Sequence, residues 1–131
     1  MKKQLNKVRE FHETFNQENG VEPRLLEVHV YALRHKLMAE ENDEYFDACK
    51  DGSLTEVADA LGDQLYILCG TILKHGMQDI IEKVFDEIHR SNMSKVDEDG
   101  KAIMREDGKI LKGPQYFKPN LKQFVEKYEQ K

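Results

Sequence analysis

The stretch that decides the fold of this chain is residues 40–63, which read EENDEYFDACKDGSLTEVADALGD. Asp51-Gly52-Ser53 in its middle is a turn signal, and both flanks have helical periodicity. If the flanks fold back as two antiparallel helices, the arms of a hairpin, acids of one arm lie opposite acids of the other. The opposite pairs are Glu40 with Asp63, Glu44 with Asp59, and Asp47 with Glu56. The sequence therefore predicts a helical hairpin with a cluster of carboxylates between its arms.

The spacing of the apolar residues indicates that these acids point inward. Leucine and valine at positions 26, 30, 33 and 37 form one stripe of the first arm, and Glu40, Glu41 and Glu44 continue it. Glu56, Asp59 and Asp63 lead in the same way into the apolar second arm. No Lys or Arg lies one helical turn from Glu41, Glu44, Glu56, Asp59 or Asp63 to offset their repulsion. A hard divalent cation offsets it, with Mg²⁺ the natural choice and Mn²⁺ a substitute.

Some of these acids also have ordinary structural explanations. Ser53 and Glu56 have the spacing of a capping box, in which the carboxylate would serve the start of the second arm. Lys36 lies one turn before Glu40 and would form a common surface ion pair with it. A wholly solvated acidic surface is the remaining alternative to a metal site.

Length and composition predict one domain over residues 1–131, with a core at about 25–95 and an extension at about 96–119. The net charge of −5 argues against a partner of nucleic acid, and no apolar run is long enough for a membrane span. Cys49 and Cys69 have no metal or redox spacing and are expected to be reduced core thiols. A cytoplasmic protein is expected from these features.

Helices are predicted at about 2–18, 25–50, 54–75, 78–91 and 120–130. The third is apolar on most faces, so we expect it to be central and expect the chain to form a homodimer or homotetramer. Gly62 and Gly70 within it suggest close approach of another group. Residues 103–111 predict a two-residue hairpin on Asp107-Gly108. The fold class is therefore all-α, a four-helix bundle with a small C-terminal β-hairpin or loop extension.

Three motifs together resemble the signature of a known enzyme superfamily. They are Glu41-x-x-Glu44, then after eleven residues Glu56-x-x-Asp59, and finally Asn92-x-x-Lys95. This arrangement resembles the all-α nucleoside triphosphate pyrophosphohydrolases, which include MazG proteins, dimeric dUTPases and phosphoribosyl-ATP pyrophosphohydrolase. The resemblance covers about residues 25–119. It implies a MazG-like helical bundle in which Glu41, Glu44, Glu56 and Asp59 bind Mg²⁺, and in which Asn92 and Lys95 contact the nucleotide or its phosphates.

The residues themselves suggest further roles around such a centre. Glu40 is the candidate general base for the attacking water, and Asp63 is either a further metal ligand or an acceptor that orients the site. Arg34 would reach a phosphate or else cover the core with its stem. Lys112 belongs to a basic and aromatic segment that would make a lid over an anion or else a solvated surface hairpin.

The resulting hypothesis is a Mg²⁺-dependent nucleoside triphosphate pyrophosphohydrolase that yields a monophosphate and pyrophosphate from non-canonical or deoxy nucleotides, as a house-cleaning enzyme. Phosphoribosyl-ATP pyrophosphohydrolase of histidine biosynthesis is the alternative within this class. A catalytically silent helical module for protein association is the alternative outside it.

Overall fold

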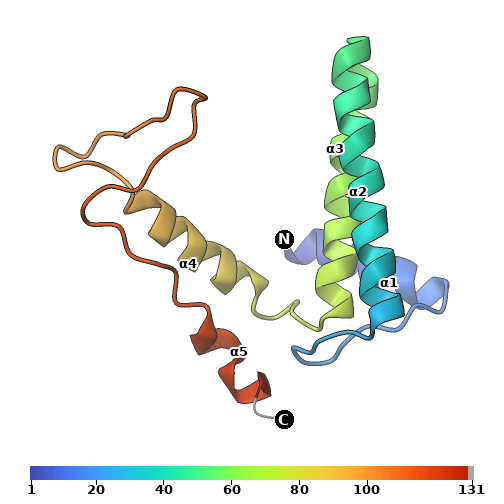
Figure 1. Cartoon of the computed structure of the whole chain (residues 1–131). Helices are drawn as coiled ribbons and strands as arrows, with labels where there is room; N and C mark the ends of the chain where they lie inside the picture. Colours follow the sequence, from blue (N-terminus) through green and yellow to red (C-terminus); the bar gives the residue numbers. More distant parts are fainter. Residues whose placement is uncertain (130–131) are drawn as a thin grey trace. The chain divides into compact units, whose positions relative to one another are not determined.

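The structure, a computed structural model, describes residues 1–129 and is helical (Figure 1). Its helices are α1 (Lys2–Thr14), α2 (Val28–Asp51), α3 (Leu54–Lys74), α4 (Ile81–Met93) and α5 (Lys122–Glu129). Strand-like pairing within the described residues is confined to one antiparallel bridge between Met104 and Ile110. The prediction of an all-α fold is confirmed. No helix in residues 1–129 is both long and apolar enough to cross a bilayer.

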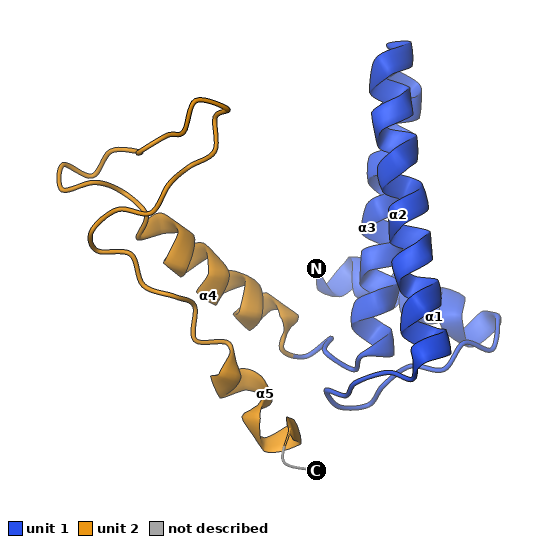
Figure 2. Cartoon of the chain, viewed as in Figure 1, with its two compact units in different colours: residues 1–79 blue, residues 80–131 orange. Residues whose placement is uncertain are grey.

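The chain divides into two compact units, residues 1–79 and residues 80–131 (Figure 2). The first contains α1, α2 and α3, and the second contains α4, the following extension and α5. This boundary falls inside the region expected to form the core, and the single domain over 1–131 stays a prediction.

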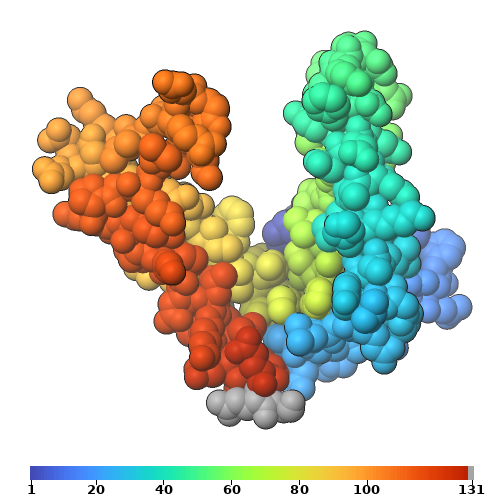
Figure 3. Space-filling view, viewed as in Figure 1, coloured from blue at the N-terminus to red at the C-terminus, as the bar shows by residue number. Residues whose placement is uncertain are grey.

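The α2–α3 hairpin is the main element of the first unit, and its turn is the predicted one. Gly52 ends α2 in the left-handed region with φ of 69°, a conformation that glycine adopts without steric cost. Ser53 then caps α3, because its Oγ accepts the N–H of Glu56 at 3.2 Å. The turn end of the hairpin projects beyond α1 (Figure 3).

The other end of the hairpin is held by α1 and by the loop that follows it. Leu5 and Val8 of α1 are buried, and α1 packs on α3. The loop is bonded to the end of α3 through Gly20 N–H to Leu73 O at 2.8 Å and through Arg24 Nε to Lys74 O at 2.9 Å. We expected the whole of α3 to be central, but its buried residues lie mainly in the C-terminal half, whereas Leu61 and Leu65 nearer the turn are exposed within the chain.

A buried polar contact joins α2 to α3, beside His12 of α1. The side chain of Arg34 donates to Thr71 Oγ1 at 3.0 Å and to Ile67 O at 2.9 Å. A Cβ on Gly70 would lie 2.6 Å from Arg34 Nη2 and 3.1 Å from His12 Nε2. Close approach at Gly70 is thus confirmed, because the glycine makes room for these two side chains. At Gly62 a Cβ would meet nothing within 4 Å in the described part of the chain, so the expected approach of another helix or a ligand stays a prediction there.

In the second unit, the chain after α4 returns along the polar face of that helix. Ser91 Oγ donates to Phe117 O at 2.7 Å, and buried Glu87 accepts the N–H of Asn120 at 2.7 Å. Phe85, on the apolar side of α4, is 68% exposed. The backbone N–H and C=O groups of the extension need hydrogen-bond partners. Polar side chains of α4 can supply these partners, and apolar side chains cannot.

The predicted hairpin on Asp107-Gly108 has a three-residue loop and not a two-residue one. Gly108 N–H donates to Arg105 O at 2.9 Å, and Arg105 N–H donates to Lys109 O at 2.7 Å. Gly108 has φ of 89°, as expected for the residue that follows a type I turn in such a loop. The same pattern occurs at residues 97–101, where Asp97 N–H donates to Lys101 O at 2.7 Å.

Candidate metal centre

Three carboxylates of the hairpin converge between α2 and α3. Glu41, Glu44 and Asp63 each offer an oxygen atom, and these atoms all lie within 4.8 Å of one another. Glu41 and Glu44 lie one turn apart on α2, and Asp63 faces them from α3. The register that brings the arms level also explains the hydrogen bond from Gln64 Nε2 to Asn42 Oδ1 at 3.3 Å.

The electrostatics of the cluster disfavour three charged acids. Burial raises the pKa of Glu41 to about 7, together with its hydrogen bond to Glu44 and the charges of Glu44, Asp63 and Asp59. Burial raises the pKa of Asp63 as well, with Asp59 and Glu44 as further causes. Glu41 Oε2 is buried and has no hydrogen-bond partner in residues 1–129. The fold therefore holds an acidic oxygen where only a proton or a cation can compensate its charge.

A second group of acids lines an open cavity of about 420 Å³ towards the turn. Its walls are Glu44, Asp47, Ala48, Asp51, Glu56, Asp59 and Ala60. Glu44 thus belongs both to the cavity and to the convergent group. Ala48 and Ala60 are buried, and their small side chains let the two acid-bearing helices approach closely.

The capping-box alternative for Glu56 accounts for the hydrogen bond of its backbone N–H, but not for the position of its carboxylate. The N–H of Glu56 donates to Ser53 Oγ, but the N–H of Ser53 donates to Ala48 O at 3.2 Å. In a complete capping box the Glu56 carboxylate would receive that second bond. The carboxylate instead lines the acidic cavity.

This donor set fits a hard divalent cation. All of the convergent groups are carboxylates, which are the ligands that Mg²⁺ and Mn²⁺ prefer. One of their oxygens has no partner, and the open cavity beside them leaves space for water and a substrate. Glu41, Glu44 and Asp63 are therefore the residues that would hold such an ion, and Glu56 and Asp59 stay predicted ligands on the wall of the adjacent cavity.

The remaining candidates lie elsewhere. Glu40 is exposed on α2, and within residues 1–129 it forms no ion pair with Lys36. Arg34 is buried and bonded to α3, as in the alternative that places it in the core. Asn92, Lys95 and Lys112 belong to the second unit, where the Lys112 ammonium lies 4.8 Å from the centre of the Tyr116 ring. Of the predicted metal ligands, the structure brings Glu41, Glu44 and Asp63 together, whereas Glu56 and Asp59 line the cavity beside Glu44. The roles of all these residues stay predictions.

Asp51 is an acid of the cavity that sequence reasoning missed. It is the last residue of α2 and stands two turns after Glu44, on the same side of the helix. Its place in the turn signal Asp51-Gly52-Ser53 concealed this spacing. A search for acids at seven-residue intervals would have found it.

The geometry above is that of an all-α pyrophosphohydrolase, with paired acidic motifs on an antiparallel helical hairpin. Comparison with protein families agrees, because the family described as phosphoribosyl-ATP pyrophosphohydrolase matches residues 8–92. The chain belongs to this family and is a pyrophosphohydrolase, which disfavours a catalytically silent module. The resemblance predicted from the acidic motifs is confirmed.

The other comparisons add little. No curated protein matches the chain. A solved structure from Exiguobacterium sp. 255-15, described as "a putative NTP pyrophosphohydrolase", is similar over 97% of this chain and 95% of its own. The sequence identity is 21% and the TM-score is 0.33, which is too low to support any argument.

The raised pKa of Glu41 predicts how the metal-free fold responds to pH. The folded pKa of about 7 lies above the ordinary value of 4.5, so the folded state binds more protons between these values. Stability should therefore fall as pH rises from about 5 to about 7. Thermal melts in EDTA measure this slope, and Glu41→Gln should flatten it. An equal slope in the parent and the variant would contradict the assignment of the raised pKa to Glu41.

Proposed function

We propose that the chain is a Mg²⁺-dependent nucleoside triphosphate pyrophosphohydrolase that converts (d)NTP to (d)NMP and pyrophosphate and so removes unwanted nucleotides. The observation that carries this proposal is the convergence of Glu41, Glu44 and Asp63, with one buried oxygen unpartnered. Mn²⁺ would substitute for Mg²⁺, because both take oxygen ligands. Family membership supports the reaction class.

The acids of the hairpin would hold the ion, and the ion would neutralise phosphate charge and lower the pKa of a bound water. Burial and the neighbouring acids raise the pKa of Glu41 to about 7, so in the metal-free state this carboxyl group holds a proton over part of the neutral range. That proton must leave when a cation binds, which couples metal affinity to pH. Glu56 and Asp59 extend the acidic wall towards the turn, where a triphosphate would meet the centre.

Other side chains would complete the reaction. Glu40 is exposed, so its carboxylate is free to accept a proton from water at the α-phosphorus, as a general base must. Asn92, Lys95 and Lys112 would contact the phosphates and offset charge on the leaving pyrophosphate. Arg34 would support the site from within the hairpin through its bonds to α3.

Phosphoribosyl-ATP is the second candidate substrate, and the name of the matched family favours it. Both candidates are cleaved between the α- and β-phosphates, so the acidic centre serves either. A panel of NTPs, dNTPs and phosphoribosyl-ATP, compared by kcat/KM in Mg²⁺, separates the two. A preference of about 100-fold or more for phosphoribosyl-ATP, about 2.7 kcal/mol in transition-state stabilisation, would replace the first proposal by the second.

The products give a sharper test of the reaction itself. We expect a nucleoside monophosphate and pyrophosphate in equal amounts, since the proposed attack is at the α-phosphorus. Chromatography of the nucleotide and a coupled pyrophosphate assay measure both products. Hydrolysis in ¹⁸O-labelled water should place the label in the monophosphate. A diphosphate with orthophosphate as the first products would refute the proposed cleavage.

A further inference from the structure

A buried ammonium group lies at the end of α3 that is far from the turn of the hairpin. Lys74 is the last residue of α3 and is only 8% exposed. Its Nζ has one hydrogen-bond partner within residues 1–129, Gln17 Oε1 at 3.4 Å, and forms no ion pair with a carboxylate there. An ammonium group can donate three hydrogen bonds, and a buried charge is costly unless an opposite charge accompanies it. Lys74 therefore lacks the partner that its burial requires.

The charges around Lys74 are mostly positive. Arg34 is buried on α2, and Arg24 reaches the end of α3, where its Nε donates to Lys74 O at 2.9 Å. Burial lowers the pKa of Lys74, as do the charges of Arg34 and Arg24, and only Glu18 opposes this shift. An anion beside Lys74 would relieve the repulsion between these cations.

Lys74 lines a cavity of about 290 Å³, called here the Lys74 cavity. The rest of its wall comes from the loop after α1 and from the start of α2, namely Glu18, Arg24, Leu25, Leu26, Glu27, His29 and Val30. Two basic side chains thus face a space that can hold a small molecule.

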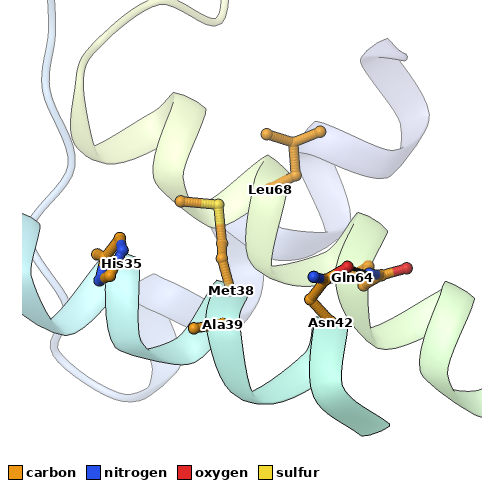
Figure 4. A pocket seen from close by; sticks show the side chains of 6 residues that line it. All are labelled: His35, Met38, Ala39, Asn42, Gln64 and Leu68. Carbon is orange, nitrogen blue, oxygen red and sulfur yellow. Dashed lines mark hydrogen bonds between the residues drawn. The ribbon is translucent and has the colours of Figure 1, made fainter. Parts of the chain in front are cut away.

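The groove between α2 and α3 has a different chemistry. Its volume is about 490 Å³, and its lining contains no Lys or Arg but only His35, Met38, Ala39, Asn42, Gln64 and Leu68 (Figure 4). Asn42 and Gln64 are also bonded to each other. An anion would find no buried positive charge in that groove, in contrast to the Lys74 cavity.

The start of α2 adds backbone donors to the Lys74 cavity. The helix begins at Val28 without a side-chain cap and without an acid in its first turn. The N–H groups of Val30 and Tyr31 both donate to Glu27 O, but those of Val28 and His29 have no acceptor within residues 1–129. Free N–H groups and the helix dipole at such an end attract anions. The buried ammonium group of Lys74 independently points to the same kind of ligand.

Two acids on the wall oppose an anion, but both are mainly in water. Glu18 is paired with Arg24 at 3.4 Å, and Glu27 is paired with His29 at 3.5 Å. Both acidic side chains are 83% exposed, so solvent screens their charges. Lys74 is buried, and its charge is screened less. A ligand with several acceptor oxygens and more than one negative charge gains most from this arrangement.

We propose that the Lys74 cavity binds an oxyanion of the phosphate type, held by the Lys74 ammonium group, the Arg24 guanidinium group and the N–H groups at the start of α2. Lys74 and Asp63 are eleven positions apart on α3, which corresponds to about 16 Å along the helix. The site is therefore separate from the acidic centre, and the inference does not rest on the proposed reaction. The bound anion would join the loop after α1, the end of α3 and the start of α2.

Titration of the full chain with inorganic phosphate in EDTA tests this site. EDTA removes divalent metal from the acidic centre, and KCl keeps the ionic strength constant so that general screening does not change. We expect saturable binding by calorimetry and a rise in Tm with phosphate concentration. Acetate, with one charge, should bind more weakly. Acetate binding as tight as that of phosphate would overturn the assignment to a phosphate-type anion.

Two lysine substitutions locate the binding. Lys74→Gln should weaken phosphate binding by about tenfold or more, because it removes a buried charged donor. Lys7→Gln is the matched control, since it removes an exposed lysine of α1 that does not line the cavity, and it should leave the affinity unchanged. Circular dichroism checks that both variants remain helical. Equal affinity in the parent and Lys74→Gln, or no saturable binding to the parent, would overturn the proposal.

A substitution of opposite sign keeps the test decisive if Lys74→Gln does not fold. Glu27→Gln removes an exposed charge that repels the anion, so it should tighten phosphate binding by about fivefold. Unchanged or weaker binding in this variant would contradict the site. Ribose 5-phosphate, titrated in the same way, distinguishes the source of the anion. Binding at least as tight as that of inorganic phosphate would assign the cavity to the phosphate group of a larger molecule, and weaker binding would assign it to free phosphate.

Discussion

Neutralising Glu44 and Asp59 together should lower kcat/KM for pyrophosphate release by about 1,000-fold or more. The reason is that a bound metal ion supplies several kcal/mol of charge stabilisation, and each 1.36 kcal/mol corresponds to a tenfold change in rate. The double variant Glu44→Gln, Asp59→Asn should also lose the rise in Tm that Mg²⁺ gives the parent. That rise corresponds to about 2.7 kcal/mol when the Mg²⁺ concentration is 100 times its Kd.

In EDTA the same double variant should melt at the same temperature as the parent or higher. Both carboxylates contribute to the raised pKa of Glu41, so removing their charge relieves repulsion in the metal-free fold. Asp43→Asn with Glu98→Gln is a matched control, because it removes two exposed acids outside the cluster. A double variant that is less stable than the parent in EDTA, yet equally stabilised by Mg²⁺, would show that the acids form a surface and not a metal centre.

The largest effect on stability is expected at Gly76. This residue has φ of 67°, and a Cβ placed on it would lie only 2.1 Å from Glu22 O, a backbone atom that cannot rotate away. Gly76→Ala should therefore cost about 3 kcal/mol or more, from the left-handed backbone of a non-glycine residue together with a steric clash. Urea denaturation followed by circular dichroism measures this change.

Gly52 provides the control for the backbone contribution. Its φ of 69° is almost the same, but a Cβ there would meet nothing within 4 Å. Gly52→Ala should cost only about 1–2 kcal/mol, the price of the left-handed conformation alone. Equal losses at the two glycines would mean that the loop at Glu22 moves aside and does not fix the end of α3.

The sequence was sufficient for the hairpin because its signals are local. Helical periodicity and the turn at Asp51-Gly52-Ser53 determine which residues come level, and the bond between Asn42 and Gln64 agrees with that register. The level partner of Asp63 is Glu41, however, and not Glu40 as predicted. Adjacent residues differ in direction by about 100° around a helix. Because Glu40 and Glu41 both fall in the predicted stripe, the sequence pattern does not show which of the two side chains points towards α3.

The parts that sequence reasoning missed depend on long-range contacts. The residues around Arg34 in the sequence would be the same whether its side chain bound a phosphate or Thr71. Only the packing of α2 on α3 distinguishes these two roles. Glu87 and Ser91 lie among apolar residues of α4, but they are the ones covered, because the returning extension brings backbone groups to them. Periodicity identifies an apolar face but does not reveal where a later segment of chain will need hydrogen bonds.

The bonds from the loop after α1 to the end of α3 also bear on how the chain folds. Arg24 and Lys74 are 50 residues apart in sequence, and Gln78 and Gly20 are 58 apart. Asn42 and Gln64, beside the acids, are only 22 apart. Each doubling of loop length adds roughly 0.6 kcal/mol to the entropic cost of closure, and contacts between distant residues slow folding. Formation of the α2–α3 hairpin, which needs only contacts between residues close in sequence, can thus bring the carboxylates together early in folding. The contacts that anchor the hairpin join residues far apart in sequence.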